Sequence, residues 1–204
     1  MKKFLAIILA LAMIMAFSAV ALADDAKPGE GITIGVVYKQ SGNAYFQAGV
    51  EGFQKAADEL GFEFMHDGPE DSSNDGQERI IRNYIDQGVD VLAISANDAA
   101  GLVDVCKEAM EKGIYVLSWD AKVDAEGRNL DIEPASAKVI GITQLESLAE
   151  SVGYEGKIGI VSAGATAPNQ NLWISYIQEE FAANEKYANM TLLDPVYGDD
   201  DYTK

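Results

Sequence analysis

The chain has 204 residues, of which 48% are apolar and 24% are charged, and its formal net charge at pH 7 is −18. This composition is typical of a globular protein and excludes collagen-like, low-complexity and coiled-coil chains. The excess of acidic residues would repel phosphate backbones, so we expect no nucleic acid as a partner. One cysteine and one histidine can form neither an internal disulfide nor a Cys-His cluster, and we expect no metal and no cofactor.

The N-terminus, residues 1–23, has the layout of a secretory signal peptide. Two lysines give it a positive start, residues 4–20 are almost entirely apolar, and Ala21-Leu22-Ala23 places small residues where a signal peptidase reads them. A membrane-spanning anchor is the alternative, because the apolar run approaches spanning length. No cysteine follows the run for lipid attachment. We therefore expect an exported chain that begins near Asp24 and is periplasmic or secreted.

After a short linker over residues 24–31, strands and helices alternate along the chain. The run Ile32–Tyr38 is β-branched and apolar, which is typical of a strand buried on both faces of a parallel sheet. Three further strands are predicted over residues 62–65, 89–94 and 114–117. Glycine follows each intervening helix, at Gly61, Gly88 and Gly113. This alternation predicts an α/β fold with a doubly wound parallel sheet and right-handed crossovers.

The polar stretch 121–128 interrupts the alternation and is the predicted crossing between two lobes. The first α/β lobe then covers residues 32–128, and a second covers residues 129–204. In the second lobe, helices are expected over 135–152 and 172–183 and strands over 157–161 and 190–196. About 70 residues are too few to cover both faces of a sheet, so we expect a truncated second lobe and an amino-terminal fragment of a longer protein.

Polar and aromatic residues gather where the predicted strands end. In a parallel α/β sheet, ligands bind outside the carboxyl ends of the strands. The candidate ligand-binding residues selected by this rule are Lys39, Tyr45, Asn97, Trp119, Asp120, Asn169, Gln170 and Trp173. Amides and carboxylates can form paired hydrogen bonds with vicinal hydroxyls, and aromatic rings pack on the C–H face of a sugar. The sequence contains no phosphate-binding glycine motif and no evident nucleophile–base pair, so we expect a binding protein and not an enzyme.

Several candidates also have a purely structural interpretation. Lys39 and Asp120 could form an ion pair across neighbouring strand ends. Tyr45 precedes an apolar residue that fits the core stripe of its helix better, which leaves Tyr45 itself as the ligand candidate. Trp119 ends a buried strand and could belong to the core. Residues 169–171 could be no more than a helix cap.

Six segments of the chain, taken together and in order, resemble the periplasmic sugar-binding proteins of ABC importers. The segments are IGVVYK at 34–39, HDGP at 66–69, DQGVD at 86–90, ISAND at 94–98, SWD at 118–120 and NQNLW at 169–173. The resemblance covers the whole mature chain and is closest to the rhamnose- and autoinducer-2-binding branch. It implies two α/β lobes joined by three crossovers, a ligand clamped between them, and no catalytic residues.

The same resemblance implies roles for individual positions. Lys39 would bind a ligand oxygen, Asp120 would accept from ligand hydroxyls, and Asn169 and Gln170 would contact the ligand from the second lobe. The implied function is capture of a small sugar or sugar-like ligand for an ABC permease. The alternative is binding of autoinducer-2, or service as a chemoreceptor ligand-binding protein. The autoinducer-2 binders carry Asp where this sequence has Asn169. Family members extend well beyond residue 204, so weak or no binding is expected of the fragment.

Overall fold

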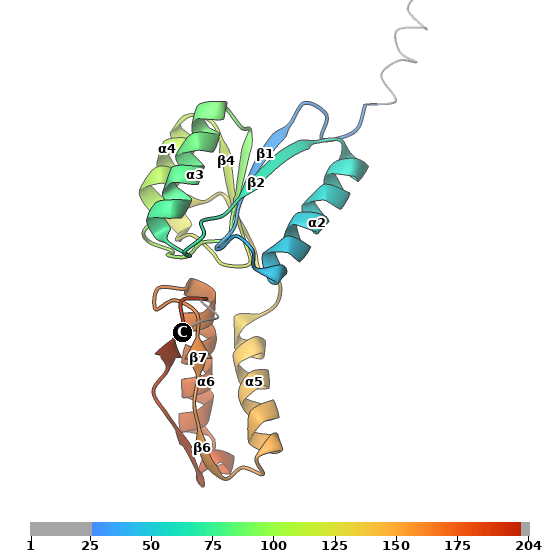
Figure 1. Ribbon diagram of the computed structural model, residues 1–204. Coiled ribbons are helices and arrows are strands. Elements are labelled where there is room, and N and C mark those ends of the chain that lie inside the picture. Colours follow the sequence, from blue (N-terminus) through green and yellow to red (C-terminus); the bar gives the residue numbers. More distant parts are fainter. Residues whose placement is uncertain (1–25, 201–204) are drawn as a thin grey trace, which may run out of the picture.

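The computed structural model describes residues 26–200, which form two α/β lobes, one above the other in Figure 1. The predicted signal peptide, residues 1–23, lies outside the described residues. Within the described part of the chain, no helix is both long enough and apolar enough to cross a membrane.

A parallel sheet of five strands forms the centre of the first lobe. Its strands are β1 (Thr33–Val37), β2 (Glu63–Asp67), β3 (Val91–Ile94), β4 (Tyr115–Trp119) and β5 (Leu130–Ile132). They are hydrogen-bonded in the order β2-β1-β3-β4-β5, and every pair is parallel. The direction in which the strands are added reverses at β1. The loops that follow β1 and β3 therefore leave the sheet side by side and turn to opposite faces.

Helices cover both faces of this sheet. α2 (Ala44–Leu60) lies on one face, and α3 (Asn74–Gln87) and α4 (Val103–Glu111) lie on the other (Figure 1). The three glycines predicted to follow these helices all have a left-handed backbone, with φ of 85° at Gly61, 74° at Gly88 and 87° at Gly113. Glycine adopts this conformation at no steric cost, so each helix can end and turn directly toward the next strand.

The two faces of the first sheet have different cores. On the side of α3 and α4 the core is mainly aliphatic, with Leu92 and Val105 fully buried. On the side of α2 it is aromatic, because Phe46 and Phe53 both pack edge-on against Trp119, at 5.9 and 5.6 Å between ring centroids. The sheet is thus held between two apolar layers, as expected for parallel strands.

The boundary between the lobes differs from the prediction. Leu130–Ile132 forms β5 and pairs with β4, so the chain changes lobes after this strand, at residues 133–136, and not within 121–128. The predicted crossing belongs to the first lobe, where Ala121 and Val123 are fully buried. β5 is short and its leucine and isoleucine are about half exposed at the sheet edge, so no buried apolar run marks it in the sequence.

The second lobe has longer helices and shorter strands. Its elements are α5 (Ala137–Ser151), β6 (Gly156–Ile158), β7 (Val161–Ser162), α6 (Pro168–Ala183), β8 (Met190–Leu192) and β9 (Val196–Tyr197). The strands pair in parallel as β6-β8 and β7-β9. Each of the two predicted strands is therefore divided, at Gly159 and at Pro195, residues that weaken a strand interior. α6 begins at Pro168 and not at 172, because proline suits the first position of a helix.

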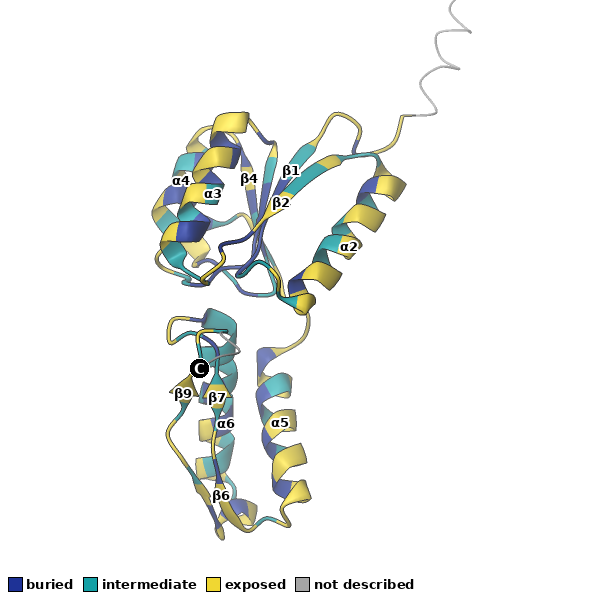
Figure 2. Ribbon diagram, in the orientation of Figure 1, coloured by how far each residue is buried: buried dark blue, intermediate teal, exposed yellow. Residues whose placement is uncertain are grey.

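The core of the second lobe is smaller and only partly covered. α5 and α6 pack closely because Gly141 has no side chain; a Cβ atom there would lie 2.6 Å from the carbonyl oxygen of Trp173. Leu145 of α5, Ile177 of α6 and Ile158 of β6 belong to one small buried cluster. On the strands, by contrast, Val161 is 81% exposed. Figure 2 shows this contrast as exposed β9 against β1 and β4, whose residues are mostly buried or intermediate.

Candidate ligand-binding site

Lys39 follows β1 and reaches from the first lobe to the second. The residue is 2% exposed, and its Nζ donates to Asn169 Oδ1 at 2.9 Å and to Gln170 Oε1 at 3.3 Å. Burial lowers the pKa of Lys39 by disfavouring the charged ammonium, while the carboxylates of Asp120 and Asp200 act in the opposite direction. The direct partners of this buried cation are neutral amide oxygens, which the hydroxyl oxygens of a ligand could replace.

Asp120 comes directly after β4 and has a left-handed backbone, with φ of 62°. Its Oδ1 accepts from the Tyr45 hydroxyl at 3.0 Å and from Asn169 Nδ2 at 3.3 Å, and its Oδ2 accepts from Ser95 Oγ at 2.7 Å. A carboxylate has about four acceptor positions, so one remains for a ligand hydroxyl. The ion pair with Lys39 considered from the sequence is not among the salt bridges of residues 26–200.

The start of α2 brings an aromatic side chain to the same place. Asn43 caps this helix by accepting from the backbone N–H of Tyr45 at 3.0 Å. Burial and the neighbouring Asp120 carboxylate raise the pKa of Tyr45 to about 12, so its hydroxyl remains a donor at neutral pH. Trp119 packs between α2 and the sheet. Its ring contacts Phe46 and Phe53 of α2, and its Nε1 donates to Ala93 O of β3 at 3.3 Å. Trp119 therefore holds α2 against the sheet.

The first turn of α6 supplies the second-lobe contacts. Ala167 is the N-cap of this helix and makes no side-chain capping bond. Asn169 Oδ1 accepts from the backbone N–H of Gln170 at 2.9 Å and also from Lys39. The helix-cap interpretation of residues 169–171 is thus incomplete, because Asn169 also reaches Lys39 and Asp120 in the other lobe. Trp173 lies one helical turn further along, on the same side of α6.

These side chains enclose a cavity of about 390 Å³ between the lobes. Six of the eight candidate residues line it, namely Lys39, Tyr45, Asp120, Asn169, Gln170 and Trp173. One part of the wall is polar, whereas Phe46, Pro134 and Ile140 make another part apolar. Ligand cavities for small molecules combine these features, with a few convergent polar groups set in an apolar wall.

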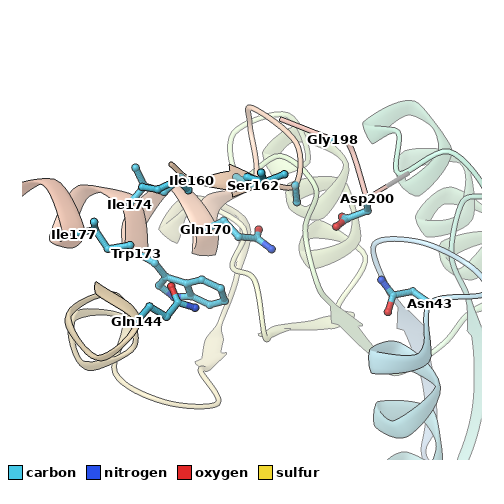
Figure 3. Close-up of a pocket in the computed structure, with 12 residues that line it drawn as sticks. Asn43, Gln144, Ile160, Ser162, Gln170, Trp173, Ile174, Ile177, Gly198 and Asp200 are labelled. Carbon is cyan, nitrogen blue, oxygen red and sulfur yellow. The ribbon is translucent and has the colours of Figure 1, made fainter. Parts of the chain in front are cut away.

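A second cavity, of about 430 Å³, adjoins the first and extends over the second lobe. The two share Asn43, Gln170, Trp173 and Asp200. In Figure 3, Gln170 and Trp173 come from the second lobe, whereas Asn43 lies across the opening on the first. The remainder of this cavity follows apolar residues such as Ile174 on α6, where the core of the second lobe is only partly covered.

Two of the candidate residues, Asn97 and Trp119, do not line the first cavity. Asn97 is 8% exposed, and its Nδ2 donates to Lys39 O at 2.9 Å, so it supports the loop that carries Lys39. Ser95 follows β3, where the strand-end rule looks, but it is not among the eight candidate residues; its hydroxyl donates to Asp120 Oδ2 at 2.7 Å. Asp200 lines both cavities, but it belongs to an acidic run whose sequence is typical of a solvated turn.

Two α/β lobes that meet over a cavity at their strand ends define a two-lobed ligand-binding protein. The model of a family described as a periplasmic binding protein domain matches residues 34–204. The chain belongs to this family. Both the predicted α/β fold and the resemblance noted in the sequence are confirmed.

Individual relatives agree with this assignment. An ABC transporter solute-binding protein from Clostridium phytofermentas, solved with bound L-rhamnose, has a TM-score of 0.83 and 31% identity, over 86% of this chain and 54% of its own. One from Burkholderia graminis, in complex with D-arabinose, has a TM-score of 0.77 and 27% identity, over 86% and 59%. The D-ribose/D-allose-binding protein of Pseudomonas aeruginosa is 28% identical over 160 residues, which are 72% of this chain and 49% of that protein. The chain thus spans about half the length of these relatives.

Proposed function

We propose that this protein is an extracytoplasmic solute-binding protein, which captures a small sugar or sugar-like ligand between its lobes for delivery to an ABC importer. The observation that carries the proposal is the convergence of Lys39 and Asp120 from the first lobe with Asn169 and Gln170 from the second. The sugar complexes of the relatives support the same ligand class.

The site suits a neutral molecule with several hydroxyl groups. Each hydroxyl can donate to Asp120 or to an amide oxygen and accept from Lys39 or from an amide nitrogen. A buried hydroxyl without such partners would bind poorly, so the site rejects ligands whose hydroxyls are misplaced. Trp173 and Tyr45 add aromatic surface at the cavity, against which the C–H groups of a sugar can pack.

Binding would exchange the contacts that now join the lobes. Lys39 donates to Asn169 and Gln170 across the cavity, so a ligand that enters must replace these bonds with its own oxygens. A ligand that contacts both lobes favours the closed arrangement, because only that arrangement provides both sets of contacts. The permease would then recognise the closed form. No step of this cycle needs a nucleophile or a cofactor, so the proposed activity is binding without catalysis.

Autoinducer-2 is the less favoured ligand. Asn169 is uncharged at the position where the autoinducer-2 binders carry Asp. Presentation of a bound sugar to a chemoreceptor is compatible with transport. Residues 1–23 support export to the periplasm or the medium, where both partners would be reached.

The test is a ligand panel on the full-length mature protein, taken from Asp24 onward. L-rhamnose, D-ribose, D-xylose, D-galactose and autoinducer-2 are each added, and the thermal unfolding midpoint is followed. A ligand that binds only the folded state raises this midpoint as its concentration exceeds the Kd. Absence of any shift with every sugar at high millimolar concentration would contradict the proposal.

Asp120→Asn then tests the site itself. Asparagine tolerates the left-handed backbone, so the fold is kept, but the acceptor loses its charge. Hydrogen bonds to charged groups are the stronger ones, and we expect sugar affinity by calorimetry to fall about 10- to 100-fold. Asp124→Asn removes the same charge from an exposed position nearby and should leave the affinity unchanged. Equal affinities for the two variants would exclude Asp120 from the site.

A further inference from the structure

Gln77, in the first half of α3, is a fully buried amide that does not line the ligand cavity. Its hydrogen bonds all go to backbone groups. Nε2 donates to Ser95 O at 2.7 Å and to Tyr38 O at 3.2 Å, while Oε1 accepts from the N–H of Asn97 at 2.8 Å. A buried amide is costly unless it is satisfied, and these three bonds satisfy much of what Gln77 can form.

The three backbone groups belong to two loops that follow β1 and β3. These neighbouring strands stand where the strand order reverses, the position at which α/β sheets open a crevice and commonly bind a ligand. Here the amide of Gln77 bridges the two loops. The side chain of Asn97 adds a second bridge by donating to Lys39 O at 2.9 Å. These two side chains bridge the crevice between the loops. Neither of them lines the ligand cavity.

Both bridged loops also carry residues of the cavity. Lys39 directly follows Tyr38, whose carbonyl is one partner of Gln77. Ser95, whose carbonyl is the other, donates through its hydroxyl to Asp120 Oδ2 at 2.7 Å. Gln77 is therefore hydrogen-bonded to the residue before Lys39 and to Ser95, whose hydroxyl orients the Asp120 carboxylate.

We propose that Gln77 is a positioning residue for the ligand site. It holds the loops after β1 and β3 at a set separation, and so places the Lys39 ammonium and the Ser95–Asp120 pair relative to each other. This role rests on the proposed function as far as sugar affinity is concerned. The position of Lys39 itself can be followed without a ligand, which separates the two questions.

The first test is Gln77→Met in the full-length mature protein. Methionine fills a similar volume but leaves the carbonyls of Tyr38 and Ser95 without their donor. We expect the loop to loosen and water to reach Lys39. The Cε resonance of Lys39, assigned by its loss in Lys39→Arg, should then titrate closer to the ordinary pKa of 10.5, with Asp120 and Asp200 still facing it. Affinity for L-rhamnose should fall about tenfold.

Ile81→Ala is the matched control. Ile81 is fully buried on the same helix, one turn further along, and belongs to the aliphatic core. This variant should lower the unfolding midpoint but leave both the Lys39 titration and the L-rhamnose affinity at the values of the unmodified chain. If Gln77→Met behaves as Ile81→Ala does, Gln77 is a core residue and the proposal is wrong.

A second variant covers the case in which Gln77→Met does not fold. Gln77→Glu keeps the acceptor for Asn97 but faces two carbonyl oxygens without a proton to donate. We expect weak L-rhamnose binding at about pH 9, where this carboxyl is ionised, and partial recovery toward about pH 6, because burial raises the pKa of a carboxyl and the protonated group donates again. No recovery relative to the unmodified chain would contradict the proposal. If the unmodified full-length protein binds none of the sugars, the proposed function fails, and the Lys39 titration alone decides the role of Gln77.

Discussion

The two lobes are built from the same kinds of element but are completed to different degrees. In the first, five parallel strands lie between helices on both faces, and Leu92 and Ile94 at its centre are fully buried. In the second, four short strands form two separate pairs, and Val161 and Val196 remain largely exposed. Parallel strands need cover on both faces, so strand–helix alternation alone does not make a stable lobe.

The difference extends to the ligand site. The first lobe holds its contribution through buried polar bonds at the strand ends, as those of Gln77 and Asn97 show. The second lobe contributes Asn169 and Gln170 from the first turn of one helix, and this helix rests on a small core. The first lobe therefore holds its part of the cavity wall by more buried polar bonds than the second lobe does.

The largest expected effect is a loss of core packing. Leu92→Ala should lower the free energy of unfolding by about 4 kcal/mol, because its surroundings are fully packed and cannot collapse into the space. Ile158→Ala in the second lobe should cost only about 2 kcal/mol, since that core is partly open. Urea unfolding, with hydrogen exchange to locate the loss, measures both. Equal costs would mean that the second lobe is as tightly packed as the first.

A smaller effect is expected where the helices of the second lobe touch. Gly141→Ala would place a Cβ atom 2.6 Å from the carbonyl oxygen of Trp173, a backbone atom that cannot move alone. Overpacking of this kind costs about 1–3 kcal/mol. Gly52→Ala is the counterpart in α2 of the first lobe, where nothing lies within 4 Å, and it should stabilise by about 0.5–1 kcal/mol. Thermal unfolding should show a lower midpoint for Gly141→Ala and a higher midpoint for Gly52→Ala. An unchanged midpoint for Gly141→Ala would show that α5 and α6 separate easily.

The smallest expected effect is a loss of stability of the second lobe at acidic pH. Lys186, Tyr154 and Tyr187 all bond to the Glu146 carboxylate and hold its pKa at about 2, below the ordinary 4.5. A lowered pKa in the folded state means that this group stabilises folding above pH 4.5 and that the contribution is lost as the pH falls toward about 2.

We therefore expect Glu146→Gln to destabilise the second lobe at neutral pH and to make its stability less sensitive to acid. Hydrogen exchange of α5 between about pH 5 and pH 3 measures this. Glu150→Gln, an exposed carboxylate on the same helix, is the control. An equal acid response of Glu146→Gln and the unmodified chain would exclude this cluster as the source.

The sequence predicted the first lobe more accurately than the second, and packing explains why. Ile32–Tyr38 is a continuous apolar run because its strand is covered on both faces, and Gly61, Gly88 and Gly113 mark turns that only a left-handed backbone can make. β5 and the strands of the second lobe are short and partly exposed, so they leave no such run in the sequence.

The site could be predicted to the same extent and for a similar reason. The ends of parallel strands lie at one edge of a sheet, which predicted that Lys39 and Asp120 lie close together, and both line the same cavity. The direction of a side chain is decided by tertiary packing, so the sequence could not show that Trp119 turns toward α2. Helical spacing does place Gln77 on the buried face of its helix, four residues before Ile81. Its bonding partners are backbone groups of two distant loops, which the sequence does not show.

The left-handed backbone at residue 120 restricts how this protein could change during evolution. A β-branched or bulky residue in that conformation is strained by about 1–2 kcal/mol, whereas aspartate, asparagine and glycine fit it readily. Tyr45 and Asn169 stand on regular helices, where most side chains are accepted. Descendants that acquired a different specificity would therefore have varied at these helical positions first, while position 120 stayed limited to aspartate, asparagine or glycine.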